Sequence, residues 1–318
     1  MFDLSSSADQ ALPLNNLSAE TISLSGCVTD FSDLPTAARA ALTIKDDLLG
    51  PLVHQDLCLA LKALSLPEHL AKEVLQALKD GCDPIQRARD LVSPHRQAFY
   101  RHFEGRSEKL AKHLEPAVSA ASREILGSCK LFDWGTGDTQ VAKQIQLLAP
   151  NLEVSGGDII PYYENEPLVP FCSINNNSVP SIPDNSLAVV TLNYVLHHEE
   201  DSRSLIKEVS RMLTMGGRAI IVELQPCGQS YEQQKLDKQR LWFSDFIFCN
   251  IWHKGDSIPM PGNYKTVQAW ESEFSEFNLK LLNQQSISGT PVIYANSENG
   301  RKLMVFEKVS QNYEYPPC

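Results

Sequence analysis

The feature that most constrains this chain is a glycine loop that directly follows a short apolar stretch. Residues 129–139 read Cys-Lys-Leu-Phe-Asp-Trp-Gly-Thr-Gly-Asp-Thr, and a helical pattern follows. The two glycines let the backbone approach a ligand closely, and the start of the next helix offers free N–H groups. A dinucleotide fingerprint needs a third glycine where this chain has Gln140, and no P-loop Gly-Lys-Ser/Thr follows. The carboxylate of Asp133, just before the loop, suits a ligand's ammonium group rather than its phosphates.

Strands and helices alternate after this loop. Buried-type strands are predicted at 129–135, 152–158, 186–196 and 218–224, with helices at 140–150 and 201–213 between them. Two last strands are predicted at 279–287 and 301–309, joined by a long loop. This alternation indicates an α/β fold with a mostly parallel sheet and helices on both faces.

The rest of the chain is less regular. We predict a loose arm at 1–34, a helical region or cap at 35–94 and a tail at 310–318. Helices are expected to begin at Pro35, to break at Gly50-Pro51 and near Gly105 and Pro116, and to end at Gly81 and Gly127. The region 226–275 is rich in aromatics, and its Trp242, Phe243, Phe246 and Trp252 either form an apolar substrate wall or pack the helical region. Whether the helical region is a substrate lid or only packs on the main domain is open.

Composition excludes some classes of function. The net charge of −11 and the pI of about 5.2 make nucleic acid an improbable ligand, because phosphate binding needs basic surface. No signal peptide and no apolar run long enough to span a membrane is visible, and the eight cysteines do not cluster, so we predict a cytoplasmic protein with reduced thiols. No Asp/His ligand group stands out along the chain, so no metal is predicted.

The order and spacing of four segments resemble the class I S-adenosylmethionine (SAM)-dependent methyltransferases, in particular the small-molecule type related to ubiquinone/menaquinone methyltransferases. The segments are the glycine loop, Asp158 at the end of the second strand, "VPSIPDNSLA" at 179–188 and "EVSRMLTMGGRAIIVE" at 208–223. The resemblance covers 95–309, with 226–275 as a substrate-lid insert, and is best between 129 and 224. It implies a Rossmann-like, seven-stranded sheet with a reversed last strand, and SAM as the cofactor.

The resemblance also implies roles for individual residues. Asp133, Gly135 and Gly137 would hold the methionine part of SAM, Asp158 with its neighbour Ile159 the ribose, and Asn176 with Asn177 the adenine. Asn193, Tyr194, His197 and His198 would line the methyl-transfer centre. The chain departs from the family pattern at Thr139, which replaces a loop glycine, and at Asn176, which replaces an acid. An Asn side chain still accepts a hydrogen bond from an amine.

These residues predict a methyltransferase that acts on a small, partly apolar molecule. For an oxygen or nitrogen acceptor, His197 or His198 is the expected general base, with Tyr194 beside them and Glu223 as a further candidate. One alternative is a protein or RNA methyltransferase that docks its substrate with the N-terminal helices. Another is a SAM-binding partner protein without catalysis, which Thr139 and Asn176 motivate. A nucleotide-dependent oxidoreductase is disfavoured by the absent third glycine. The oligomeric state is left open.

Overall fold

The computed structural model describes residues 35–79, 83–103, 105–125, 129–161, 166–252, 258–287 and 300–310. The predicted arm at 1–34, the loop between the last two strands, nearly all of the predicted tail, and Gly81 and Gly127 lie outside this range. None of the helices within it is long and apolar enough to cross a membrane.

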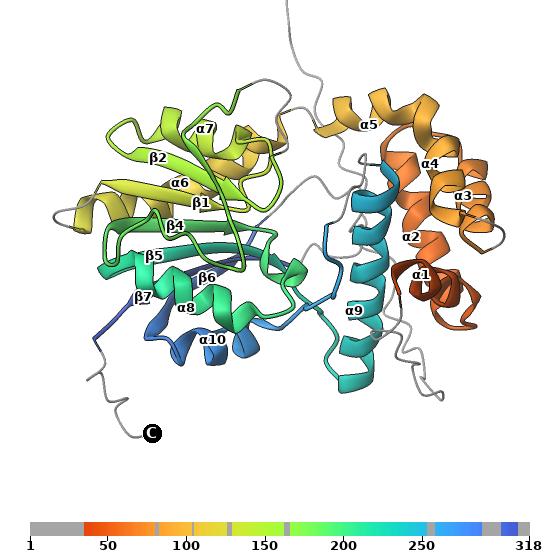
Figure 1. Ribbon diagram of the computed structural model, residues 1–318. Helices are drawn as coiled ribbons and strands as arrows, with labels where there is room; N and C mark the ends of the chain where they lie inside the picture. The colour runs from red at the N-terminus through yellow and green to blue at the C-terminus, as the bar shows by residue number, and fades with distance from the viewer. Residues whose placement is uncertain are drawn as a thin grey trace, which may run out of the picture.

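A seven-stranded sheet forms the centre of the larger part of the molecule (Figure 1). The strand order is β3-β2-β1-β4-β5-β7-β6. The first five strands run parallel, and β7 is antiparallel to both of its neighbours. This confirms the predicted α/β class and the reversed last strand. The strands are β1 (Lys130–Trp134), β2 (Glu153–Asp158), β3 (Phe171–Ser173), β4 (Leu187–Asn193), β5 (Leu213–Leu224), β6 (Leu279–Ser286) and β7 (Arg301–Lys308).

Helices cover both faces of the sheet because side chains alternate along each strand. Leu131 faces a core with α6 (Arg106–Glu124) and α7 (Gln140–Leu148). Its neighbour Phe132 faces the opposite core, with α8 (Ser202–Met212) and α10 (Val267–Ser275). Val189 and Val190 of β4 divide in the same way. The central strands are therefore buried on both faces and read as continuous apolar runs.

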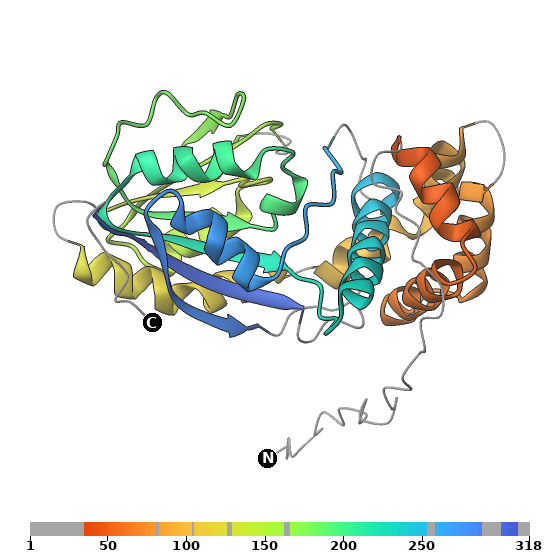
Figure 2. The same cartoon turned by 90° about the horizontal axis from the view of Figure 1, so that it is seen from below.

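A helical region stands beside the sheet, and α9 (Tyr231–Phe246) lies between the two (Figures 1 and 2). Helix α9 contacts α1 and α2, and the π-helix η3 that continues it (Ile247–Trp252) contacts α4. Trp242, Phe243, Phe246 and Trp252 are buried in one core with the helical region, which is the second of the two arrangements considered for them. The other elements are α1 (Thr36–Lys45), α2 (Leu49–Ala63), α3 (His69–Lys79), α4 (Pro84–Val92), η1 (Ser93–His95), α5 (Arg96–Phe103) and η2 (Leu196–His198).

Two predicted helix breaks are wrong in position. Helix α6 continues through Pro116, although proline removes a helical hydrogen bond at a cost of about 3 kcal/mol. Burial of Leu110, Leu114 and Val118 on one face of α6 offsets that cost. Pro51 lies in the first turn of α2, where its missing N–H is not needed, so the break falls just before Leu49.

Candidate active site

The glycine loop connects β1 to α7 at the edge of the sheet where the parallel strands end. The N–H groups of Gly135 and Thr136 both donate to the carbonyl of Gly157, which ties the loop to the end of β2. Gly135 has φ +70°, and a Cβ there would lie 2.4 Å from the Cγ2 of Val195. Both the backbone conformation and the close approach require glycine.

Thr139 occupies the position of a missing loop glycine, and its conformation shows why glycine is usual there. It has φ +63°, a region that side chains rarely adopt. The side chain is fully buried, and its hydroxyl donates to the carbonyl of Asp138 and accepts from the N–H of Leu168. Thr139 therefore fixes the segment that precedes β3.

Asp133 is held at the end of β1 beside β4. The strand register places it next to Thr191, whose hydroxyl donates to Oδ1 over 2.6 Å. The Nδ2 of Asn193 donates to the same oxygen over 3.0 Å. Burial raises the pKa of Asp133 to about 6, although these hydrogen bonds oppose the rise. The Oδ1 of Asn193 is also buried and accepts no hydrogen bond from the residues described. This corner of the loop is thus rich in buried acceptors.

Asp158 ends β2 on the other side of the loop. Its Oδ2 accepts the N–H of Gly137 over 2.8 Å. Burial raises its pKa, and hydrogen bonds from the backbone of Gly137, Ile160 and Ile159 oppose the rise. The side chain of Ile159 is half exposed. Asp133, Gly137 and Asp158 are thus brought to one loop, as predicted from their positions at strand ends.

Asn176 and Asn177 form the tip of a tight turn after β3. Both have positive φ, and Asn175 and Ser178 exchange backbone hydrogen bonds across them. Asparagine tolerates this conformation better than most residues. The side chain of Asn176 is exposed, and the Nδ2 of Asn177 donates to the carbonyl of Asp201 over 3.3 Å. Their adenine role stays a prediction.

Tyr194 turns the chain at the end of β4, with φ +60°. Its N–H donates to the carbonyl of Val222, and its half-buried ring lies against both the sheet core and the helical core. The guanidinium of Arg106 lies 5.3 Å from the centre of this ring. Tyr194 therefore stands where the sheet meets the helical region.

His197 and His198 follow in η2, and neither points freely into solvent. The Nδ1 of His197 lies 2.7 Å from Glu223 Oε2, and its Nε2 lies 3.3 Å from Asp245 Oδ2. Burial alone would lower the pKa of His197, but the two carboxylates outweigh it and raise the pKa to about 10. Burial and the neighbouring His197 lower the pKa of His198. The general-base role of either histidine stays a prediction.

Asp245 belongs to this site, although its sequence position did not predict it. It lies near the end of α9, with 3% of its side chain exposed, within the aromatic run Trp-Phe-Ser-Asp-Phe-Ile-Phe. A lone carboxylate inside an otherwise apolar stretch is the signal that could have identified it, because a buried charge needs partners.

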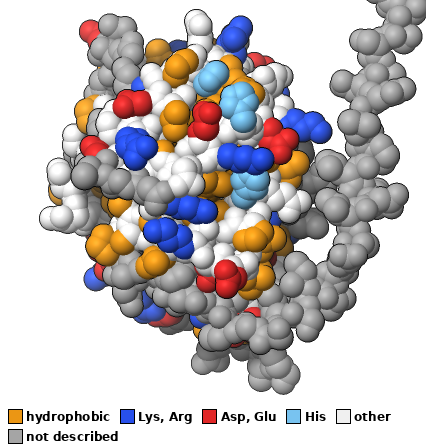
Figure 3. Space-filling view, turned by 90° about the vertical axis from the view of Figure 1, so that its right-hand side faces the viewer, with side chains coloured by type: hydrophobic (Ala, Val, Ile, Leu, Met, Phe, Trp, Pro, Cys, Tyr) orange, Lys and Arg blue, Asp and Glu red, His pale blue; other side chains and the backbone are white. Residues whose placement is uncertain are grey.

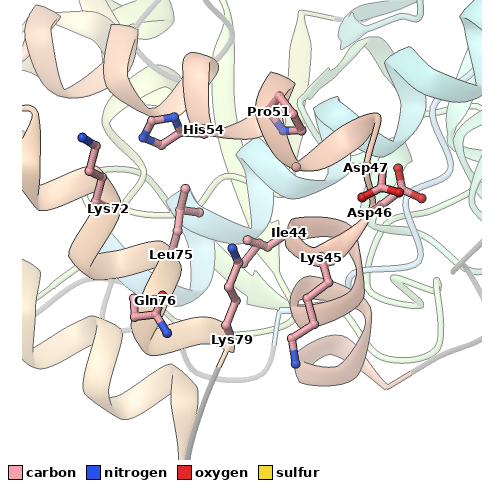
Figure 4. A pocket seen from close by; sticks show the side chains of 11 residues that line it. Ile44, Lys45, Asp46, Asp47, Pro51, His54, Lys72, Leu75, Gln76 and Lys79 are labelled. Carbon is pink, nitrogen blue, oxygen red and sulfur yellow. The ribbon is translucent and has the colours of Figure 1, made fainter.

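A separate hollow lies on the helical region. Figure 3 faces this side of the molecule and shows basic, acidic and histidine side chains mixed across it. The pocket of about 690 Å³ is lined only by residues from α1, α2, α3 and the α1–α2 connection, and none of the predicted site residues lines it (Figure 4). Lys45, Lys72 and Lys79 stand there with Asp46 and Asp47.

Comparison with known proteins assigns the segment that contains the glycine loop to a protein family. Residues 132–221 match the family described as methyltransferase domain. These residues belong to the class I SAM-dependent methyltransferases. The methyltransferase domain so defined contains Asp133, the glycine loop, Asp158 and the histidine pair, and SAM is the cofactor of the family.

Two relatives illustrate the similarity. The ubiquinone/menaquinone biosynthesis C-methyltransferase UbiE of Desulfotalea psychrophila is 28% identical over 107 residues, which is 31% of this chain and 43% of that protein. The chain thus matches less than half the length of this curated relative. The CurJ carbon methyltransferase has a similar fold, with a TM-score of 0.53 and 15% identity over 87% of this chain and 81% of that one.

Proposed function

We propose that the chain is an enzyme that transfers the methyl group of SAM to a small, partly apolar molecule. The observation that carries this proposal is the buried acceptor group beside the glycine loop. The Asp133 carboxylate and the Oδ1 of Asn193 lie together, and the latter accepts nothing from the described residues. Buried acceptors without a donor are costly, so this corner fits a cationic donor such as the ammonium of SAM.

The remaining residues fit the other parts of the cofactor. Gly135 keeps the loop backbone open where a Cβ would meet Val195. Asp158, anchored by the N–H of Gly137, is oriented at the strand end to accept ribose hydroxyls. Asn176 and Asn177 stand on the next loop as adenine ligands. We assign Asn193 and Tyr194, at the end of β4, to the methyl-transfer centre.

SAM supplies an already activated methyl group, whose bond to sulfur breaks while the bond to the acceptor forms. The chain's task is to hold the acceptor in line with that bond and to exclude water. Tyr194 and the segment after it stand between the sheet and the helical core, where an acceptor would be enclosed. An oxygen or nitrogen acceptor must also lose a proton. Of the two predicted bases, His198 fits this role better, because a pKa of about 10 keeps His197 protonated near neutral pH.

The net charge of the chain and the name of its curated relative both favour a small molecule as the methyl acceptor. The net charge of −11 opposes RNA binding. The curated relative is named for methylation in quinone biosynthesis, which is small-molecule chemistry. This substrate class is the part of the proposal that needs acceptor screening.

The first test is calorimetric titration with SAM and with S-adenosylhomocysteine. We expect micromolar binding by the unchanged protein and a loss of at least about tenfold in Asp158→Asn, since hydrogen bonds to charged groups contribute about 1.5–3 kcal/mol. Asp184→Asn, an exposed carboxylate paired with Arg211, is the matched control and should bind normally. Absence of binding by folded, unchanged protein would refute the cofactor assignment.

The second test measures S-adenosylhomocysteine release with panels of acceptors. Release with small phenols, quinols or isoprenoid compounds is expected. Release only with peptides or RNA would contradict the small-molecule assignment. Tight SAM binding with no release for any acceptor would favour a non-catalytic partner protein.

A further inference from the structure

Three possible metal ligands converge where the sheet meets α9. The Nε2 atoms of His197 and His198 lie 3.3 Å and 3.4 Å from the same oxygen, Oδ2 of Asp245. One ligand atom from each of the three residues lies within 4.8 Å of the others. The histidines lie in η2, after β4, and the aspartate lies near the end of α9, so the fold joins segments that are distant in sequence.

The Nδ1 atom of each histidine lies within hydrogen-bond distance of an acceptor. His197 Nδ1 lies 2.7 Å from Glu223 Oε2, and Glu223 also accepts the N–H groups of Leu196 and Leu224. His198 Nδ1 lies 2.8 Å from the carbonyl of Pro259, which can only accept. Both Nδ1 atoms therefore carry the hydrogen, and both Nε2 atoms point toward Asp245. Metal-binding histidines are oriented in this way by carboxylates and backbone carbonyls.

The two imidazoles are held close together in a buried place. Their ring centres lie 4.2 Å apart, and both Nε2 atoms are turned toward the same carboxylate oxygen of Asp245. A divalent ion bound to all three residues would give this oxygen and both nitrogens one shared partner.

The distances and surroundings suit a small transition-metal ion. Two ligands bonded tetrahedrally to Zn²⁺ at about 2.0–2.1 Å stand about 3.3–3.4 Å apart, which matches both nitrogen–oxygen distances here. The aspartate is supported in turn, since the hydroxyl of Tyr264 donates to Oδ2 and the thiol of Cys249 to Oδ1. Only 17% of the His198 side chain is exposed, and 2–3% of the other two.

We propose that His197, His198 and Asp245 bind a divalent transition-metal ion, Zn²⁺ by ligand type, that fastens α9 to the end of β4. Two imidazoles with one carboxylate are a ligand set that zinc accepts. This departs from the sequence-based prediction of no metal, because ligands from separate elements leave no local spacing to detect. The proposal does not rest on methyl transfer, since metal binding is measured without SAM. A bound ion would occupy the Nε2 lone pairs of both histidines, so the proposed base role would apply only to the metal-free protein.

The test is titration of chelator-treated full-length protein with Zn²⁺ and with Co²⁺. We expect one ion per chain and a Co²⁺ spectrum with d–d bands but no thiolate charge-transfer band. Asp245→Asn and His198→Gln should each weaken binding at least about 100-fold, while His69→Gln, on an exposed histidine of α3, should leave it unchanged. Glu223→Gln, which weakens the support of His197 but removes no ligand, should weaken binding about 10–100-fold.

Thermal unfolding supplies a readout that does not depend on activity. Saturating Zn²⁺ should raise the Tm of the unchanged protein and of His69→Gln, but not that of Asp245→Asn. If Asp245→Asn does not fold, the Glu223→Gln and His198→Gln affinities decide the matter. The proposal would be overturned if the unchanged protein bound Zn²⁺ no more strongly than these variants do. A thiolate charge-transfer band in the Co²⁺ spectrum, which would indicate a cysteine site, would also overturn it. SAM binding that persists in metal-free protein would leave the proposed function standing.

Discussion

At the scale of single residues, the site depends on the carboxylates of Asp133 and Asp158, whose ionised forms are destabilised by burial. Asp133 is 1% exposed, and its pKa is raised to about 6. A raised folded-state pKa means that the neutral form is favoured, so this group contributes less stability as the pH rises from its unfolded value of 3.8 to about 6. A bound cation would reverse that preference.

We therefore predict that SAM binding weakens below pH 6. At pH 5 most of Asp133 is protonated in the free protein, and binding the SAM ammonium must expel that proton. One pH unit below the pKa this costs about tenfold in affinity, and the cost disappears by pH 7. Calorimetry at pH 5, 6 and 7 in buffers of different ionisation enthalpy measures both the affinity and the proton released.

Asp133→Asn is the control for this prediction. The variant should bind SAM less tightly at pH 7 and show a smaller pH dependence. Some pH dependence of SAM binding should remain because of Asp158, whose pKa is also raised by burial. An affinity that is equal at pH 5 and pH 7 in the unchanged protein would contradict contact between Asp133 and the ammonium.

Gly135 gives a second prediction at this scale. Gly135→Ala should lower the free energy of unfolding by about 2–3 kcal/mol, through its positive φ and the contact with Val195. Gly216→Ala, with φ +75° and no neighbour within 4 Å, should cost only about 1 kcal/mol. Urea denaturation measures both. Equal losses would mean that the close approach to Val195 has no energetic weight, and Val195→Ala should recover part of the larger loss in a double-mutant cycle.

Single residues also explain what the sequence could predict of the site. Asp133 and Asp158 were predicted because each ends an apolar strand, and parallel strand ends meet at one edge of a sheet. Asp245 was not predicted, because its partners are set by the packing of α9 on η2. The same holds for Thr191, which reaches Asp133 only through the register of β1 and β4.

At the element scale, α9 decides how the two parts of the molecule fit. Its last six residues, 241–246, are all buried, by the helical region on one side and the sheet edge on the other. A helix buried all round has no apolar stripe, so its sequence lacks the period that identifies a surface helix. For that reason α9 was predicted only as an irregular aromatic insert, while α7 and α8, with one exposed face, were predicted within two residues of their ends.

An ion pair links α9 to α2. The guanidinium of Arg240 donates to both oxygens of Asp56, over 2.9 Å and 2.7 Å. Both side chains are largely buried, so Asp56→Asn should lower the free energy of unfolding by about 2–3 kcal/mol by leaving Arg240 poorly paired. Chemical denaturation followed by tryptophan fluorescence would measure this.

The exposed pair of Arg203 and Glu276 is the comparison for that variant. Glu276→Gln should leave stability close to unchanged, because water and salt screen the pair. A loss as large as that of Asp56→Asn would mean that burial does not separate the two pairs.

At the scale of the whole molecule, the helical region and the sheet share buried surface through α9. Removing residues 1–79 would delete α1, α2 and α3 and expose Trp242, Phe243 and Phe246 of α9, which α1 and α2 contact. We expect the shortened protein to bind an apolar fluorescent dye and to associate in size-exclusion chromatography. A monodisperse shortened protein with a cooperative melting transition would show that the helical region is an independent addition.

The layout also has a consequence for synthesis on the ribosome. Asp56 meets its partner Arg240 across 184 residues, and α1 and α2 cannot complete their core until α9 has emerged. At about 5–20 residues per second, the nascent helices wait roughly 10–40 s with apolar faces uncovered. The sheet strands β1 to β5 are made during that interval. Helices α1 and α2, which are made before the sheet, are therefore among the last elements to reach their final packing, and chaperone contact should be concentrated on them.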